Sequence, residues 1–253
     1  MSKINNSVWI WQQMITPHVV ALATALAERG FKVNFVANEK LSKDRIQQGW
    51  EVLELGKVKL LLAPNKDTVI RYVSNASQNS IHLCQGLRGN GLVSCAQSVI
   101  RKRGLKHWVM METVDDLGWD GFIKKFLYRI LFLYWQKNLS GVLAIGQNMV
   151  DWVVARGMNK RLVYPFAYFL KEPSINNSLD SPIKKKMKRP FRFIFVGQLI
   201  NLKKVDFLIK AIAALKFKEF EFWIVGGGPE EKRLRVLANT LLPKKVFWFG
   251  VLP

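Results

Sequence analysis

The sequence has few cysteines and few histidines, and both shortages exclude classes of protein. Cys84 and Cys95 are the only cysteines, too few for a disulfide scaffold or a cysteine-based zinc site. The three histidines are scattered along the chain and do not form a metal-ligand pattern. Low cysteine usage is typical of proteins in a reducing compartment.

Segments that direct a chain into or across a membrane are also missing. No basic segment followed by an apolar run and a small-residue cleavage site is visible near the start, so we expect no export and a cytoplasmic protein. The longest apolar stretch, residues 126–135, contains Arg129 and is well short of the roughly 20 residues that a spanning helix needs. We therefore expect no transmembrane helix.

Hydrophobic and basic residues are abundant. Hydrophobic residues form 49% of the 253 residues, beside 17 glycines and 9 prolines, as in a folded protein of one large or two small domains. The 39 Lys and Arg residues exceed the 18 Asp and Glu residues and give a net charge of +21. This charge favours anionic partners such as lipid headgroups, nucleic acid or phosphorylated substrates, and does not choose among them.

Alternating strand and helix patterns organise the first part of the chain. After the first strand, Thr16 is a plausible helix N-cap, Pro17 suits the first helical position, and Gly30 can close the helix. Strands are predicted at 8–11, 32–37, 58–62, 80–84, 107–111, 141–145 and 161–164. The alternation predicts an α/β fold with a mainly parallel sheet covered by helices.

A polar, basic segment separates this part from a second one. Residues 172–190 are rich in Pro, Asn, Ser, Lys and Arg, so we interpret them as a linker between domains at 1–171 and 191–253. Strands at 191–196, 220–225 and 246–249, with helices between them, predict a second α/β unit. Three strands leave an exposed edge and a small core, which is a marginal arrangement.

Two loops of this second unit follow strands and precede helices. In an open α/β sheet, ligands bind at the carboxyl ends of strands, so both loops should converge on one anion. Glycines there let backbone N–H groups approach a phosphate, although a glycine turn used only for packing and solvated lysines are the alternatives. The loop residues are Gly197, Gln198, Lys203 and Lys204 in the first, and Gly226, Gly227, Gly228 and Pro229 in the second.

Three segments in this order carry a resemblance. They are Phe195-Val196-Gly197-Gln198-Leu199 with Lys203 and Asp206, then Ile224-Val225-Gly226-Gly227-Gly228-Pro229, then Phe249-Gly250. Together they resemble the donor domain of family 4 glycosyltransferases, which have the two-domain GT-B architecture. Residues 11–12, 15–18, 85–89, 143–146 and 165–169 are similar to bacterial surface-polysaccharide members, so the resemblance covers nearly the whole chain.

The resemblance implies a pair of Rossmann-type domains, the first binding an acceptor and the second a nucleotide sugar. It implies transfer with retained anomeric configuration, without a metal or other cofactor. Lys203 matches the lysine that neutralises the donor diphosphate, and residues 226–228 match the loop beside the nucleotide. The chemistry agrees, because preorganised cations stabilise the charge of a leaving diphosphate.

The sequence departs from the family pattern at two places. Gln198 stands where the family usually has arginine, and a neutral amide cannot replace a bidentate cation. The family's Glu-x7-Glu segment, which contacts the donor sugar and ribose, would lie beyond the last residue, Pro253. We therefore expect the second domain to be incomplete, and favour truncation as the reason.

Acceptor-side candidates lie in the first domain. Thr16 and His18 stand at a helix start after the first strand, and Glu112 follows a strand, near a position where many relatives have histidine. Glu112 and His18 could act on acceptor hydroxyls as general acid, base or positioning groups, but an ordinary strand-end carboxylate is an alternative. Arg88 could contact an acceptor phosphate or be merely solvated. Asp115 and Asp116 lack the Asp-x-Asp metal pattern and predict a surface turn.

Residues 122–137 interleave aromatic and basic side chains and are preceded by the basic residues Arg101, Lys102, Arg103 and Lys106. Such a helix can dock on an anionic membrane, where lipid-linked acceptors would give the docking a purpose. A core helix with a basic outer face is the alternative.

The resemblance, together with the charge and the basic aromatic segment, implies a retaining, metal-independent glycosyltransferase of hexosyltransferase type at the cytoplasmic face of a bacterial membrane. It would transfer a sugar from a nucleotide sugar to a glycan or lipid-linked acceptor in surface polysaccharide or lipopolysaccharide synthesis. An acceptor-binding half that needs a partner chain or a missing C-terminal segment is the alternative. A nucleic-acid-binding protein agrees with the charge, but no recognition motif supports it.

Overall fold

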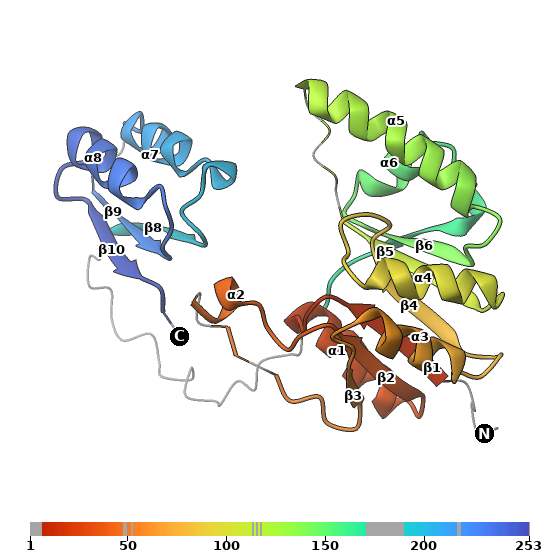
Figure 1. Ribbon diagram of the computed structural model, residues 1–253. Helices are drawn as coiled ribbons and strands as arrows, with labels where there is room; N and C mark the ends of the chain where they lie inside the picture. The colour runs from red at the N-terminus through yellow and green to blue at the C-terminus, as the bar shows by residue number, and fades with distance from the viewer. Residues whose placement is uncertain are drawn as a thin grey trace. The chain divides into compact units, whose positions relative to one another are not determined.

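The computed structural model in Figure 1 describes residues 7–47, 50–51, 53–112, 114, 116, 118–170, 190–216 and 219–252. The chain divides into two compact units, Met1–Ser42 with Val52–Glu172, and Lys43–Glu51 with Pro173–Pro253. The short helix α2 (Lys43–Gln47) therefore groups with the second unit. The linker predicted at 172–190 lies, except for Pro190, outside the described residues.

A seven-stranded sheet of order β3-β2-β1-β4-β5-β6-β7 forms the centre of the first unit, and its neighbouring strands are all parallel. The predicted parallel sheet is confirmed. Its strands are β1 (Ser7–Gln12), β2 (Lys32–Ala37), β3 (Lys59–Leu62), β4 (Ile81–Gln85), β5 (Lys106–Met111), β6 (Gly141–Ile145) and β7 (Val163–Phe166). The last strand begins two residues later than expected, because a 3₁₀ turn, η1 (Lys160–Leu162), precedes it.

Helices cover both faces of this sheet. They are α1 (Pro17–Glu28), α3 (Lys66–Ser74), α4 (Val93–Lys102), α5 (Gly118–Trp135) and α6 (Met149–Val154). As predicted, Pro17 begins α1 and Gly30 follows it with φ +89°. Thr16 is the N-cap residue, as predicted. Its backbone carbonyl accepts hydrogen bonds from the N–H groups of Val19 and Val20, and its side chain forms no capping hydrogen bond.

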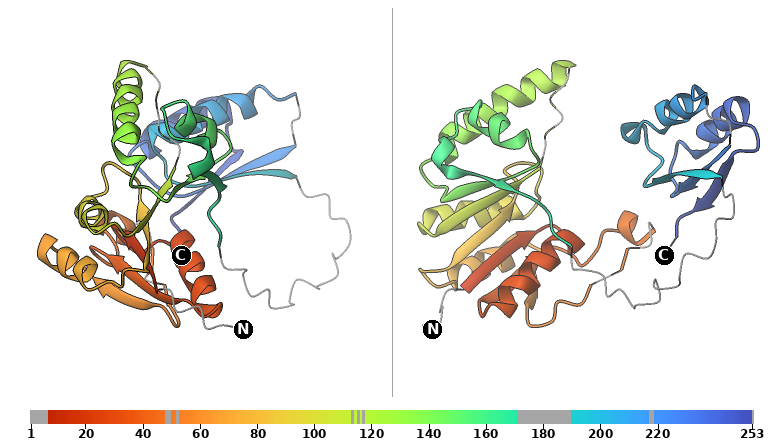
Figure 2. Two further views of the ribbon diagram at one scale, coloured as in Figure 1. Left: turned by 90° about the vertical axis from the view of Figure 1, so that its right-hand side faces the viewer. Right: turned by 180° about the vertical axis from the view of Figure 1, so that it is seen from behind.

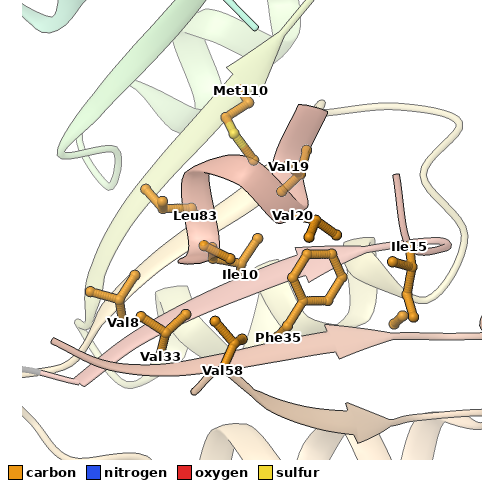
Figure 3. Close-up of a cluster of buried hydrophobic side chains, with 12 residues drawn as sticks. Val8, Ile10, Ile15, Val19, Val20, Val33, Phe35, Val58, Leu83 and Met110 are labelled. Carbon is orange, nitrogen blue, oxygen red and sulfur yellow. The ribbon is translucent and has the colours of Figure 1, made fainter. Parts of the chain in front are cut away.

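The core of the first unit lies in separate layers on the two faces. Figure 3 shows the layer under α1, where Ile10 and Phe35 of the strands meet Val19 and Val20 of the helix. Neighbouring strand residues such as Trp11 point to the opposite face, since side chains alternate along a strand. There α3 and α4 pack over the middle of the sheet, and α5 and α6 over β5, β6 and β7.

The second unit contains a three-stranded parallel sheet of order β10-β9-β8. Its elements are β8 (Phe191–Val196), a 3₁₀ turn η2 (Asn201–Lys203), α7 (Val205–Ala213), β9 (Phe220–Val225), α8 (Glu231–Leu241) and β10 (Val246–Gly250). The helices α7 and α8 bury one face over Phe222 and Ile224, as Figure 2 also shows. On the other face Ile194 and Phe249 remain exposed, which agrees with the small core that the sequence predicted.

Two histidines lie buried side by side in the larger sheet. His82 of β4 pairs with His107 of β5, and both are fully buried. The indole N–H of Trp11 donates to Nδ1 of His82 at 3.0 Å, so the neutral ring carries its proton on Nε2, 2.9 Å from Ser80 Oγ. Neither ring nitrogen of His107 has a hydrogen-bond partner among the described residues. Burial is the main cause that lowers the pKa of His82 to about 3 and of His107 to about 4.

These lowered pKa values predict that acid destabilises the first unit. Unfolded histidines bind protons below about pH 6.5, whereas the folded ones stay neutral until about pH 4, so the free energy of unfolding should rise with pH between these limits. Each histidine contributes a slope of at most about 1.4 kcal/mol per pH unit. His107→Leu removes one titrating group without losing a hydrogen bond, and should lower the slope in urea unfolding. Equal slopes for both proteins would contradict this assignment.

Candidate functional site

The loops after β8 and β9 lie against each other and are joined by backbone hydrogen bonds. The N–H of Leu199 donates to the carbonyl of Gly227 at 2.9 Å, and the N–H of Glu230 donates to the carbonyl of Leu199 at 3.0 Å. At the strand ends, the N–H of Gly197 donates to the carbonyl of Val225 at 3.0 Å. The predicted convergence of the two loops is therefore confirmed.

Two glycines permit this close approach. A Cβ at Gly226, where φ is +133°, would lie 1.9 Å from the carbonyl oxygen of Gly197. A Cβ at Gly228 would lie 2.5 Å from the carbonyl oxygen of Leu199. Gly227 differs, because its Cβ would meet only side-chain atoms, Cγ2 of Val251 at 3.3 Å and Oε2 of Glu231 at 3.9 Å. Close backbone packing thus explains the first two glycines, whereas Gly227 joins the loops through its carbonyl and has no backbone atom against its Cβ position.

The loop lysines lie in the turn η2 and at the start of α7. Lys203 ends η2, is exposed, and forms no ion pair within the described part of the chain. Lys204 takes the left-handed conformation, with φ +49°, and its Nζ donates to Oδ1 of Asn201 at 3.0 Å. Gln198 is half-buried, and Pro229 lies in the turn before α8, which begins at Glu231. Exposed Lys203 is therefore the cation that is available to a ligand here.

On the first unit, the structure brings His18 and Glu112 together through a third residue. The hydroxyl of Tyr168, which follows β7, donates to Oε1 of Glu112, which follows β5. The Tyr168 ring also stacks on the imidazole of His18 in α1, with centroids 4.8 Å apart. Burial, and then the neighbouring Glu112 carboxylate, raise the pKa of Tyr168, so its hydroxyl stays protonated and remains a donor. Sequence reasoning missed this role of Tyr168, and only its place after a parallel strand hinted at it.

Arg88 does not join that cluster. Its guanidinium lies over the ring of Tyr128 in α5, with Cζ 5.8 Å from the centroid, so it is not merely a solvated loop residue. Buried amide side chains fix its loop: Nδ2 of Asn90 donates to the carbonyl of Gln85 at 2.8 Å, and Nε2 of Gln97 donates to that of Gly86 at 2.8 Å. The loop that carries Arg88 is therefore rigidly tied to β4 and α4.

The side chain of Asp116 binds other segments of the chain, whereas the sequence predicted that it lies in a surface turn. Asp115 lies outside the described residues. Oδ2 of Asp116 accepts from the Trp152 indole at 2.8 Å and pairs with Arg156 at 2.8 Å. The hydrogen bond from Trp152 is the main cause that lowers the pKa of Asp116. Among the described residues, no group of three or more His, Cys, Asp and Glu side chains could hold a metal ion.

Helix α5 has an apolar surface on both sides. Its inner face buries Gly121, Phe132 and Trp135. Its outer face carries a continuous stripe of exposed side chains, of which Trp119 is 86% exposed; we call Trp119, Phe122, Ile123, Phe126, Ile130 and Leu133 the α5 stripe. The outward positions of α5 are therefore mainly apolar, and Lys125 and Arg129 are exposed beside them. The helices of the described residues all fall short of the length and apolar character that a bilayer-spanning segment requires.

The second unit is similar to a known protein family. Residues 177–253 match the family described as glycosyl transferases group 1. A search of curated protein sequences found no match to the chain.

Solved structures that are similar to this chain have the GT-B fold. The lipopolysaccharide outer core galactosyltransferase WaaB, at 15% identity and a TM-score of 0.60, matches 97% of this chain and 68% of its own. HepE of Anabaena, solved with UDP and glucose, matches at 13% identity and a TM-score of 0.64; the match covers 97% of this chain and 69% of HepE. WaaG, a glycosyltransferase involved in lipopolysaccharide biosynthesis, matches at 15% identity and a TM-score of 0.53; the match covers 97% of this chain and 70% of WaaG. The predicted GT-B pair of Rossmann-type domains is thus confirmed, with the second only partly represented.

The glycine geometry gives a matched pair of variants. Gly226→Ala places a Cβ against backbone at a φ that L-residues avoid, and should destabilise the second unit by about 2 kcal/mol or more. Gly227→Ala adds the same methyl group where only the Val251 side chain must move, and should cost less than about 1 kcal/mol. Hydrogen exchange of the β8 and β9 amides in the full chain measures both. Similar protection in the two variants would contradict the close approach of the loops.

Proposed function

We propose that this protein transfers a sugar from a nucleotide-sugar donor to a glycan or lipid-linked acceptor in the synthesis of a bacterial cell-surface polysaccharide. Transfer retains the anomeric configuration and uses no metal or other cofactor. The observation that carries the proposal is the pair of hydrogen-bonded loops at the carboxyl ends of β8 and β9, on a group 1 glycosyltransferase domain. The titles of similar structures support it, since HepE was solved with UDP-glucose and WaaG is involved in lipopolysaccharide biosynthesis.

The donor binds at the paired loops. Exposed Lys203, with Lys204 beside it, neutralises the diphosphate, whose negative charge grows as the sugar leaves. Gly197, Gln198 and residues 226–229 line the nucleotide, and the glycine backbone there lets N–H groups approach it. The neutral Gln198 contributes hydrogen bonds but no charge, so Lys203 carries most of the electrostatic stabilisation.

The acceptor binds at the carboxyl edge of the larger sheet. Tyr168 fixes the Glu112 carboxylate by donating to one oxygen, which leaves the other free to accept from an acceptor hydroxyl. His18, held by ring stacking on Tyr168, and Thr16 bind further hydroxyls. Arg88 binds an acceptor phosphate. Glu112 then positions the attacking hydroxyl or receives its proton.

The α5 stripe docks the protein on the cytoplasmic face of a membrane. An exposed row of aromatic and aliphatic side chains suits the interface of a bilayer, and the exposed Arg129 on the flank of α5 suits anionic headgroups. This places the acceptor edge near lipid-linked substrates, because α5 begins at the carboxyl end of β5, where Glu112 lies.

One observation favours the second candidate, an acceptor-binding half that needs further polypeptide. Ile194, Val196, Phe247 and Phe249 form an exposed apolar face on the small sheet, on the side that α7 and α8 do not cover. A covering segment or partner chain would complete that domain. The donor experiment below separates the two candidates.

Titration with uridine and guanosine diphosphate sugars should raise the thermal stability of the chain for one nucleotide, by about 2.7 kcal/mol at a hundredfold excess over Kd. Lys203→Ala should abolish the shift. Lys210→Ala, which removes the same charge from the far end of α7, should retain the shift.

Transfer of the sugar should survive the addition of EDTA, and NMR of the product should show the retained anomer. Unchanged transfer by Glu112→Gln would remove Glu112 from the mechanism. A stability shift without transfer would favour the incomplete-half candidate, and no shift with any donor would overturn donor binding by this chain.

Membrane docking has its own test. The chain should sediment with phosphatidylglycerol-containing vesicles at low salt, and Phe122→Ser with Phe126→Ser should reduce the bound fraction several-fold, because both side chains lie in the α5 stripe. The control, Leu62→Ser with Ile70→Ser, removes exposed apolar side chains at β3 and α3 and should bind as the wild type does. Equal loss in both variants would contradict docking through α5.

A further inference from the structure

We propose that the first unit binds the phosphate of an anionic lipid headgroup in a basic pocket at the C-terminal end of α5. The inference deepens the membrane docking proposed above and rests on it. The pocket, of about 230 Å³, lies between the end of α4, the start of β5 and the turn from α5 to β6. It is therefore at the amino edge of the sheet, opposite the edge that carries His18 and Glu112.

Three cations line the pocket, and no carboxylate does. They are Arg101 of α4, Lys106 at the first position of β5 and Lys137 after α5, joined by the polar side chains of Asn138 and Ser140. Within the described residues, none of the three forms an ion pair. The C-terminal ends of α4 and α5 attract cations and so explain Arg101 and Lys137, but Lys106 begins a strand and has no such partner. Convergence of all three on one concavity favours an anion.

Arg101 is preorganised for that anion. Its guanidinium lies over the rings of Tyr134 and Trp135, with Cζ 4.5 Å and 5.4 Å from their centroids. These two cation–π contacts hold the guanidinium in place and leave its N–H groups for a ligand. A held guanidinium loses little freedom when it binds phosphate oxygens in bidentate fashion.

The same contacts join the pocket to the α5 stripe. Tyr134, on which Arg101 stacks, is 53% exposed and neighbours Leu133, the last residue of the stripe. A lipid whose phosphate sits in the pocket can therefore lay its acyl chains along the stripe. A pocket of about 230 Å³ is smaller than ordinary ligand sites, which suits a phosphodiester headgroup better than a nucleotide sugar. Continuity with an apolar surface favours a lipid over free phosphate.

The test compares two double variants that remove equal charge. Lys106→Gln with Lys137→Gln neutralises the pocket and leaves Arg101 and its ring contacts in place. Lys57→Gln with Lys66→Gln neutralises two exposed lysines near β3, at the other end of the sheet. Binding to mixed phosphatidylcholine and phosphatidylglycerol vesicles is measured by sedimentation. Monomeric dihexanoyl phosphatidylglycerol, dihexanoyl phosphatidylcholine and inorganic phosphate are titrated by calorimetry.

We expect the pocket variant to lose about 20-fold in vesicle affinity, since each lysine near an anionic surface contributes roughly fivefold, and the control to stay within about twofold of wild type. Dihexanoyl phosphatidylglycerol should bind the wild type and the control, but not the pocket variant, and the choline lipid should bind none.

Equal affinity of the pocket variant and the control for vesicles would overturn the headgroup site while leaving α5 docking intact. Inorganic phosphate that binds as tightly as the glycerol lipid would also overturn it, in favour of a soluble anion. A wild type that binds the monomeric lipid in the pocket but no vesicles would support the site and contradict docking. A wild type that binds neither the monomeric lipid nor the vesicles would overturn both the headgroup site and the membrane docking.

Discussion

Parallel strand pairing is the constraint on which both units depend. Because every neighbouring pair is parallel, the carboxyl ends of all strands in a sheet meet at one edge, and each return to the next strand needs a crossover. This alone gathers His18, Glu112 and Tyr168, which are far apart in the sequence, at one edge of the first unit. It likewise brings the loops after β8 and β9 into backbone contact, where Gly226 allows an approach that no side chain would permit.

Much of this arrangement could be predicted from the sequence, because it follows from local patterns. Buried parallel strands are short apolar runs bounded by turns, so β2, β6, β8 and β9 were predicted to the residue. The predicted start of β7 was wrong by two residues, because a 3₁₀ turn precedes the strand. In that turn the Asn159 side chain accepts a hydrogen bond from the backbone N–H of Arg161, and hydrophobic periodicity does not show such a bond.

The parts that could not be predicted depend on contacts between distant segments. Apolar side chains lie all round α5, among its basic ones, so their periodicity does not reveal which face of the helix meets the sheet. Asp116 was expected in a surface turn, yet it is bound by Trp152 and Arg156, far along the chain. The hydrogen bond from Tyr168 to Glu112 spans 56 positions, so no spacing rule could have linked the two residues.

The course of α5 has a mechanical consequence. The helix starts at the carboxyl edge, where Glu112 lies, and ends at the amino edge beside Arg101. A body that rests on a surface along one helix can roll about the helix axis, so the stripe alone leaves the tilt of the sheet undefined. In the proposed lipid site, Lys106 of β5 would add a second contact outside the helix and stop the roll. On this proposal, the far end of the unit sets the angle at which its acceptor edge meets the lipid surface.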